Sequence, residues 1–554
     1  MPTVDRANLS IDELMEELAT VRRQADELEA AIQAAQGESA RRAVEYPRLV
    51  KRVQEAVAEE VPVGSTVLVV SKGDRELVEL GRRRKGWHFP RAEDGRYAGY
   101  YPKAEISAVA HLEALRGRGA DYLLFPGTAA WWLDHYPMFA RHLDARYRRI
   151  DYQDVCAIFA LRERPSHGPL DRLRELVEDL AACTADEPAV LDWHTGTDMS
   201  VLSQCIVFNP PVEGETLPYV AHGADIVVVA TEDPGRLAEA RRVASTAVVN
   251  LHAANHDGAV EVVAQAPQTL APPAVSVIIP CFNGVELTRT CLATLLDTLP
   301  RNFRGEVLIV DDRSKDGTSK LARSMARADT RVRVIRNRKN LGFLGSCNRG
   351  AAEASGDYLV FLNNDTVLLP GWLPPLLRTF ADYSDAGVVG GRLLYEDGRL
   401  QEAGCLVFND ASAAKIGYGD PDADAPIYRH VREVDYVSAA LLATPRALFE
   451  ELGGLDPRYG FGYYEDDDYC FAVRATGRCV YYQPEATIVH VEGATAGRDV
   501  LAGPKRQQVI NRRVFAEKWS DALRLQPKRP EPLDRAALYR LSSPDHRYTR
   551  GGNA

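Results

Sequence analysis

Residues 340–366, NLGFLGSCNRGAAEASGDYLVFLNNDT, decide the fold class of the C-terminal half of this chain. The glycines at its start predict a loop, residues 347–354 predict a short helix, and residues 355–357 predict a turn. The apolar run at residues 358–362 is short enough to be a buried strand. A helix that leads into a buried strand is typical of an α/β domain.

Three polar residues follow this predicted strand directly. Asn363, Asn364 and Asp365 come after five apolar residues, which places them at the carboxyl end of the strand, where open α/β sheets bind their ligands. A carboxylate there can hold Mg²⁺ or Mn²⁺ that is shared with a diphosphate. Asn and Asp are also common turn formers, so the stretch alone leaves a surface turn open.

The length and composition limit the class of protein. The chain has 554 residues, 45% of them apolar and 26% charged, which predicts three or four soluble globular domains. The net charge of -11 argues against general nucleic-acid binding. No run approaches the roughly 18 apolar residues of a membrane span, and no signal sequence is evident. The nine cysteines include no CxxC pair, so we expect a cytoplasmic protein without a zinc site or disulfide framework.

The N-terminal segment, residues 1–45, predicts an amphipathic helix. Ser10 and Glu13 form a capping box, and apolar residues recur in steps of three and four through residues 10–36. So narrow an apolar stripe needs a partner. The pattern favours a parallel coiled coil and a homodimer, and packing against the rest of the same chain is the alternative.

Residues 46–165 predict an α/β domain of unknown role. Strands at residues 66–70, 121–125 and 156–160 alternate with helices, which indicates a mainly parallel sheet. The first strand ends in SKGD, without the glycine spacing of a phosphate loop. An aromatic cluster fits either a carbohydrate-binding surface or a core or domain interface; its members are Trp87, His88, Phe89, Tyr97, Tyr100 and Tyr101.

Residues 166–268 predict a second α/β domain. Its strands at residues 189–192 and 224–230 resemble those of methyltransferases that use S-adenosylmethionine. Those enzymes need a glycine-rich turn after the first strand, and this turn has Trp193 and His194 with only Gly196. We therefore expect a degenerate, non-catalytic relative. A proline-containing linker follows at residues 265–274.

The remaining motifs lie in order between residues 274 and 495. They are VSVIIPCFNG, VLIVDDRSKDGT, NLGFLGSCNRG, LNNDT and GGLDPRYGFGYYEDDDYCFAVRATG. Together they resemble family 2 glycosyltransferases with the GT-A fold, of the rhamnosyl- and galactofuranosyl-transferase type. The resemblance implies a glycosyltransferase domain at residues 274–525, with a charged, proline-interrupted tail at residues 526–554. The fold class is thus a multidomain α/β protein, with two smaller Rossmann-like domains before the GT-A domain.

The resemblance also implies a metal site. Asp365 matches the aspartate of the family's DXD-type motif, and Asn363 stands where an aspartate is usual. His490 matches a position that supplies a second metal ligand. Because Asn363 is uncharged, the site has one negative charge fewer. Binding of the expected Mn²⁺ or Mg²⁺ would therefore depend more on the diphosphate of the donor.

Transfer to a hydroxyl needs a base, and residues 465–468 offer four acids at a predicted helix start. Acidic residues at the start of a helix can also be present only because they stabilise the helix dipole. The family pattern selects Asp466 as the base of an inverting displacement and gives Asp468 a structural or acceptor-contacting role.

The donor side follows from the same resemblance. A nucleotide-diphosphate sugar, with uridine or deoxythymidine, is the expected donor. Its base, ribose, diphosphate and sugar would be contacted by Pro280, Asp312, Asn340, Gly342, Asn348, Asn363 and Asn364. Ala439 replaces a usual glycine beside the donor sugar, and residues 411–430 are expected to form an acceptor-side lid.

The leading interpretation is a metal-dependent, inverting glycosyltransferase that acts on a glycan, lipid-linked or natural-product acceptor. A lipid-linked acceptor would bring peripheral membrane association. Two alternatives stay open: a scaffold or acceptor-recruiting protein with a weak or inactive transferase domain, and a bifunctional methyl- and glycosyltransferase.

Overall fold

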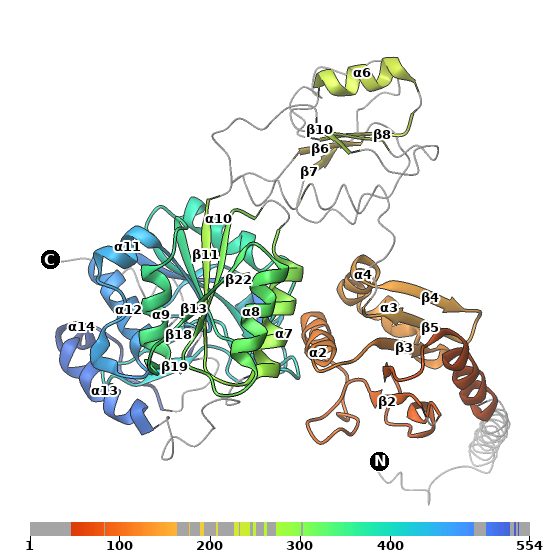
Figure 1. Ribbon diagram of the computed structural model, residues 1–554, viewed down its shortest axis with the longest axis horizontal. Coiled ribbons are helices and arrows are strands. Elements are labelled where there is room, and N and C mark those ends of the chain that lie inside the picture. The colour runs from red at the N-terminus through yellow and green to blue at the C-terminus, as the bar shows by residue number, and fades with distance from the viewer. Residues whose placement is uncertain are drawn as a thin grey trace, which may run out of the picture.

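The computed structural model describes residues 46–162, 273–491 and 506–531, except 82 and 301–302, together with separate pieces at 177, 189–192, 206–208, 226–231, 233–243, 247–250, 260–262, 537–538 and 541. These residues form three α/β parts, coloured orange, yellow and green to blue along the chain in Figure 1. The predicted coiled coil at residues 1–45 lies outside the described residues. In the described part of the chain, no helix is long and apolar enough to cross a bilayer.

The N-terminal part begins with a helical stretch at residues 46–60 and contains a five-stranded sheet of order β2-β1-β3-β5-β4. β1 runs parallel to its neighbours β2 and β3, as expected, whereas β5 runs antiparallel to both of its neighbours, β3 and β4. Only residues 153–155 separate β4 from β5, which is too short for the crossover that a parallel pair needs. The elements are β1 (Thr66–Val69), β2 (Lys85–His88), α2 (Glu105–Gly117), β3 (Tyr122–Pro126), α3 (Trp131–His135), α4 (Pro137–Arg146), β4 (Arg148–Tyr152), β5 (Cys156–Ala160) and short 3-10 turns at Glu76–Val78 and Gly127–Ala129.

The middle part has a sheet of order β10-β9-β8-β6-β7, parallel except for β10. The predicted strand at residues 189–192 is present. The turn at residues 193–196, on which the methyltransferase comparison rests, lies outside the described residues. The elements are β6 (Ala189–Asp192), β7 (Ile206–Phe208), β8 (Ile226–Val229), α6 (Pro234–Val243), β9 (Ala247–Asn250) and β10 (Val260–Val262).

The C-terminal part is built on a ten-stranded sheet whose first half, β13-β12-β11-β14, is parallel. Side chains of a strand alternate between its two faces. Ile278 of β11 packs with α9, whereas Val277 and Ile279 pack with α7 and α10. Both faces are therefore covered, which explains why these strands are apolar throughout.

Figure 1 shows this layering, with α9 and α12 on one side of the sheet and α7 and α8 on the other. The elements of this half are β11 (Val275–Cys281), α7 (Val285–Thr298), β12 (Gly305–Asp311), α8 (Thr318–Ala328), β13 (Val332–Arg336), α9 (Gly342–Ala352) and β14 (Tyr358–Leu362).

The second half continues as β21-β16-β22-β15, with β17 beside β16 and β20 beside β22. The elements are β15 (Thr366–Leu368), α10 (Leu373–Asp382), β16 (Ala386–Leu394), β17 (Leu400–Glu402), β18 (Cys405–Val407), β19 (Ala413–Lys415), β20 (Arg432–Glu433), β21 (Leu441–Pro445), α11 (Arg446–Glu451), α12 (Glu465–Ala475), β22 (Cys479–His490), α13 (Arg506–Lys518), α14 (Ser520–Arg524) and 3-10 turns at Pro426–Tyr428 and Pro457–Tyr459.

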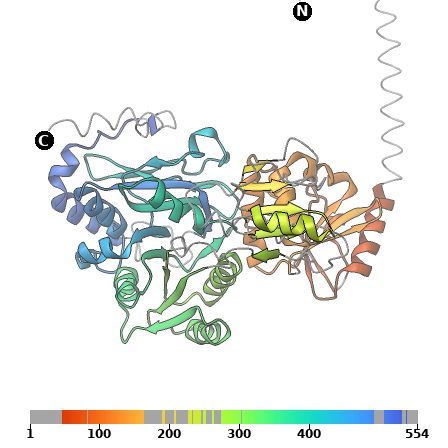
Figure 2. The same ribbon diagram turned by 90° about the horizontal axis from the view of Figure 1, so that it is seen from above.

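The N-terminal and C-terminal parts pack against each other through α2. The Ser107 hydroxyl donates to the carbonyl of Gly398 at 2.7 Å, and the Thr290 hydroxyl of α7 donates to the carbonyl of Gly117 at 3.1 Å. One continuous cluster of buried apolar side chains spans both parts. Figure 2 shows the two parts side by side.

The described start of the predicted tail lies against the C-terminal part. The Asn409 N–H donates to the carbonyl of Pro527 at 3.0 Å, and the Arg529 guanidinium donates to the Ser412 hydroxyl at 3.1 Å. These residues therefore contribute to the region that was expected to form the acceptor-side lid.

Candidate active site

The polar residues that follow the parallel strands meet at one edge of the sheet. In the strand register, Cys281 pairs with Asp311 and Asp311 with Arg336, while Phe361 pairs with Ile278. β11, β12 and β13 therefore end level, and β14 ends about two residues earlier at the same edge, so that these strand ends converge as the sequence predicted.

Asp312 holds the turn that leads into α9. Its carboxylate accepts hydrogen bonds from the Asn337 side chain at 2.8 Å and from the backbone N–H groups of Leu341 and Gly342 at 2.7 and 2.9 Å. Gly342 has φ +73, and a Cβ there would lie 2.5 Å from Phe461. The structure thus gives Asp312 and Gly342 a role in shaping the loop.

The other predicted donor contacts have varied surroundings. Pro280 is buried in β11, and Asn340 is exposed at the turn. The Asn348 amide donates to the carbonyl of Leu455 at 2.7 Å and accepts from its N–H at 2.9 Å. The Asn364 amide donates to the Thr288 hydroxyl of α7 at 2.9 Å. Asn348 and Asn364 are therefore engaged within the protein, and their contact with a donor stays a prediction.

Asn363, Asp365 and His490 come together between β14 and β22. His490 Nε2 lies 3.3 Å from Asp365 Oδ1 and 3.2 Å from Asn363 Nδ2. Thr366 pairs with His490 where β15 meets β22, and this pairing joins positions far apart in the chain. The Asp365 side chain is buried, and Asn363 Oδ1 is a buried acceptor without a hydrogen-bond partner among the described residues.

This group fits a divalent cation with few protein ligands. Two ligand atoms that are each about 2.1 Å from an octahedral metal lie about 3 Å apart, close to the spacing of His490 Nε2 and Asp365 Oδ1. Gln401 Oε1 lies 2.8 Å from His490 Nδ1, and such a contact assigns the proton to Nδ1 and leaves Nε2 as a ligand. In the described part of the chain, no three His, Cys, Asp or Glu side chains are arranged so that they could together hold a metal ion. Further ligands would therefore come from Asn363, water or a bound diphosphate.

The four acids at the start of α12 have different surroundings. Asp468 is bound by the Tyr459 hydroxyl at 2.8 Å, the Lys518 ammonium at 2.7 Å and the Trp519 indole N–H at 2.8 Å. Three donors from the protein thus bind both oxygens of this carboxylate, which supports a structural role for Asp468.

Asp466 differs from its other two neighbours. Glu465 and Asp467 are buried, and burial, followed by the charge of Asp466, raises the pKa of both carboxyl groups well above their usual range. Asp466 is only half-buried, and its Oδ2 accepts from the Ala439 N–H at 3.2 Å. Asp466 is therefore the acid of this group that a substrate can reach.

The loop before α12 is strained and anchored from a distance. Tyr463 and Tyr464 have φ of 73 and 69, which is costly for large side chains. The Asn511 amide of α13, fully buried, donates to the carbonyls of Tyr459, Gly462 and Tyr463 at 2.7–2.9 Å. The tertiary contact with Asn511 fixes the loop that positions Asp466.

Comparison with known proteins assigns part of the chain to a family. Residues 276–418 match the model of glycosyl transferase family 2. The chain contains a family 2 glycosyltransferase domain. Asp466 and His490 lie beyond the matched residues.

Relatives of the family 2 domain include enzymes of known class. The chain is 29% identical over 260 residues to mouse polypeptide N-acetylgalactosaminyltransferase 15, covering 45% of this chain and 40% of that protein. It is 30% identical over 132 residues to a beta-1,3-glucosyltransferase of Campylobacter jejuni that acts on GalNAc(5)-diNAcBac-PP-undecaprenol, covering 24% of this chain and 41% of that protein. The chain thus spans under half the length of these relatives. A solved structure of GalNAc-T7 with UDP, GalNAc and Mn²⁺ is 17% identical with a TM-score of 0.38, covering 46% of this chain and 49% of that one.

Glu402 is a buried acid near Asp466 that the sequence analysis missed. Glu402 Oε1 accepts from the Ser438 N–H at 2.9 Å, and Ala439, the next residue, donates to Asp466. Burial raises the pKa of Glu402, while the charge of Lys415, 3.8 Å away, lowers it. In the sequence, Gln401 and Glu402 come one residue after the charged turn at residues 396–399, so they look like a continuation of that surface turn.

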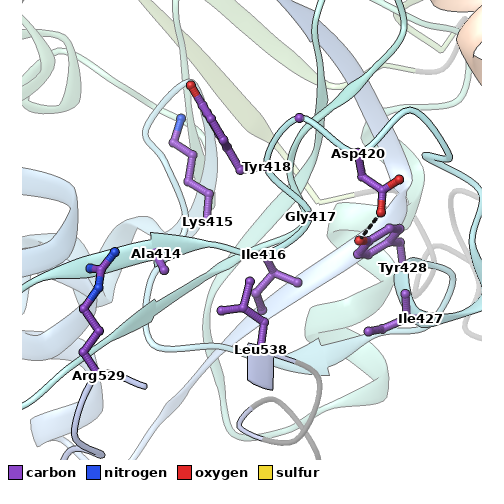
Figure 3. Close-up of a pocket in the computed structure, with 11 residues that line it drawn as sticks. Ala414, Lys415, Ile416, Gly417, Tyr418, Asp420, Ile427, Tyr428, Arg529 and Leu538 are labelled. Atoms are coloured by element: carbon purple, nitrogen blue, oxygen red, sulfur yellow. Dashed lines mark hydrogen bonds between the residues drawn. The ribbon is translucent and has the colours of Figure 1, made fainter. Parts of the chain in front are cut away.

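A hollow of about 520 Å³ opens in the family 2 domain beside β19 (Figure 3). It coincides with the predicted acceptor-side lid, and Lys415 connects its wall to Glu402. Asp420 accepts from the Tyr428 hydroxyl at 2.7 Å inside it. The lining residues are Ala414, Lys415, Ile416, Gly417, Tyr418, Gly419, Asp420, Ile427, Tyr428, Arg529 and Leu538.

Proposed function

We propose that residues 274–525 form a metal-dependent, inverting glycosyltransferase that uses a nucleotide-diphosphate sugar. One observation carries the proposal. The Asn363 N–H donates to the carbonyl of Ala440 at 3.3 Å, and the Ala439 N–H donates to Asp466. Two adjacent residues therefore join the cation-binding group to the candidate base.

In the proposed reaction, Asp466 accepts the proton of an acceptor hydroxyl as the hydroxyl oxygen bonds to C1 of the donor sugar. The bond between C1 and the diphosphate breaks, and its electron pair leaves with the diphosphate. Attack from the face opposite the diphosphate inverts C1. A divalent cation held by Asp365 and His490 would neutralise charge on the departing diphosphate.

The half-buried position of Asp466 supports this role, because a base must be reachable by its substrate. The donor sugar of the rhamnosyl or galactofuranosyl type, the glycan, lipid-linked or natural-product acceptor, the coiled-coil dimer and the cytoplasmic location stay predictions.

A panel of UDP, GDP and dTDP sugars, tested by thermal unfolding with and without MnCl₂, tests this function. We expect one nucleotide to raise the melting temperature only when Mn²⁺ is present, because a ligand that binds the folded state stabilises it. Asp365→Asn should lose that shift. An absence of any Mn²⁺-dependent shift, together with no donor hydrolysis, would contradict the proposal.

A second candidate is a scaffold or acceptor-recruiting protein with a weak transferase domain. Asn363, in the place of a usual aspartate, favours it, as does the firm packing of α2 against the family 2 domain. Measurable Mn²⁺-dependent donor hydrolysis would dismiss a pure scaffold.

A further inference from the structure

A strip of aromatic side chains runs from the hollow toward the N-terminal part. Seven aromatic side chains are exposed in the described part of the chain. Tyr418, 64% exposed, lines the hollow, and its ring lies 6.2 Å from that of Tyr395, edge to face. In Figure 3, the Tyr418 side chain points away from Tyr428. Aromatic surface therefore extends beyond the hollow.

The turn between β16 and β17 continues this strip. The Arg399 guanidinium lies over the Tyr395 ring at 5.7 Å and pairs with Asp397 at 2.7 Å. The charges of Asp397 and Arg399 also act on the pKa of Tyr100, which burial raises most. The segment that carries Tyr100 leads into α2, whose Ser107 hydroxyl donates to the carbonyl of Gly398 in this turn.

The strip ends on the N-terminal part, at the carboxyl edge of its parallel strands. Tyr100 and Tyr101 are 44% and 41% exposed, and Trp131 is 36% exposed. The Tyr101 and Trp131 rings lie 5.4 Å apart, edge to face. Four of the seven exposed aromatic side chains thus belong to one strip.

The two halves of the strip are fixed relative to each other. The Ser107 hydroxyl donates to the carbonyl of Gly398, and His111 Nδ1 lies 2.5 Å from the carbonyl oxygen of Glu396. Arg118 forms an ion pair with Glu396. These contacts from α2 hold the turn that separates Tyr395 from Tyr100.

We propose that this strip, Tyr418, Tyr395, Tyr100, Tyr101 and Trp131, binds the sugar chain of an oligosaccharide acceptor whose end enters the hollow. The proposal rests on the proposed function, because Lys415 of the hollow pairs with Glu402, Glu402 accepts from the Ser438 N–H, and the next residue, Ala439, donates to the candidate base. Aromatic faces stack on the C–H faces of sugar rings, and tyrosine hydroxyls bind sugar hydroxyls. Asp397, Arg399 and Lys415 supply charged hydrogen-bonding groups along the same path. The centre of a protein–protein interface is usually poor in charged groups, which favours a sugar chain as the occupant.

Native gels that contain dextran, mannan, arabinogalactan or a bacterial rhamnan test the strip. We expect at least one of these polysaccharides to retard the full-length protein. Tyr101→Ala with Trp131→Ala, and separately Tyr395→Ala with Tyr418→Ala, should weaken the retardation at least tenfold. Tyr383→Ala is the matched control, because Tyr383 is 37% exposed and packs with Tyr481 outside the strip. Melting temperatures identify any variant that fails to fold.

Retardation by none of the four polysaccharides, or equal retardation of wild type and both folded double variants, overturns the proposal. A strip that serves as a protein interface would instead change sedimentation in the variants without any polysaccharide effect. Donor hydrolysis by the wild-type protein separates the two proposals. If the wild-type protein binds a polysaccharide but hydrolyses no donor, the proposed transferase activity is contradicted, whereas sugar binding by the strip is supported.

Discussion

The two ring nitrogens of His490 face different groups. Nδ1 faces Gln401, whereas Nε2 faces Asp365 and Asn363. The sequence predicted the approach of Asp365 and His490, because Asp365 follows an apolar strand, His490 lies in another, and both match family positions. It did not predict Gln401, since a partner on another strand depends on strand pairing that no local pattern encodes. For the same reason, the engagement of Asn364 with Thr288 was not foreseen.

Gln401→Ala should weaken metal binding by about 10- to 100-fold, because the orienting partner of a metal-binding histidine is lost. The Mn²⁺ concentration that half-maximally raises the melting temperature with nucleotide present measures this. Gln153→Ala, a change at an exposed residue of the N-terminal part, is the control. An unchanged Mn²⁺ requirement in Gln401→Ala would mean that His490 does not bind the metal.

Asn363→Asp should strengthen metal binding, in contrast to Gln401→Ala. A second carboxylate beside Asp365 adds charge at the cation, and a gain of about 1.4 kcal/mol would lower the required Mn²⁺ concentration about tenfold. The same Mn²⁺ titration measures it, with Asn363→Ala as the comparison. A higher Mn²⁺ requirement in Asn363→Asp would show that residue 363 lies outside the metal site.

The loop at residues 460–464 and α12 act together. The acids of α12 were visible in the sequence, but the left-handed backbone at Tyr463 and Tyr464 was not, because large residues rarely adopt it. Its anchor, Asn511, lies about fifty positions further along the chain. A distant side chain therefore determines where the candidate base stands.

Asn511→Ala should destabilise the protein by about 2–3 kcal/mol, because three buried carbonyls lose their donor. Donor hydrolysis should fall with it, since Asp466 is no longer held. Gln507→Ala is the milder control, because it removes only a donor to the Asn511 amide oxygen. Urea unfolding and hydrolysis rates measure both variants. Wild-type stability and activity in Asn511→Ala would show that Asn511 does not anchor this loop.

At the scale of the molecule, the N-terminal and C-terminal parts form one packed unit. Glu113, 1% exposed, accepts from Arg116 and lies 2.7 Å from His142 Nε2, and Arg146 pairs with Asp297 of α7. The sequence predicted α/β domains with a boundary near the prolines of the linker. It did not predict this interface, because the buried ion network combines residues from three helices and looks like ordinary surface charge in the sequence.

Glu113 gives this unit a pH dependence. Burial alone would raise its pKa, but the charge of Arg116, then the His142 bond, outweigh burial and lower the pKa well below the usual range. A lowered folded-state pKa stabilises the protein above the unfolded pKa of about 4.3, and this stabilisation is lost progressively as the pH falls from there through the folded-state pKa. Glu113→Gln should therefore lower the melting temperature most at pH 7, with a smaller difference at the lowest pH at which the wild-type protein stays folded. An equal difference at both pH values would contradict this assignment.

The role of Asp466 as the general base is tested by the rate at which Asp466→Asn hydrolyses the nucleotide sugar with Mn²⁺. We expect a fall of about 10²–10⁴-fold, because the general base is lost, while the Mn²⁺-dependent thermal shift with nucleotide stays as in the wild type. A rate equal to that of the wild-type protein would contradict Asp466 as the base and, with it, the proposed active site.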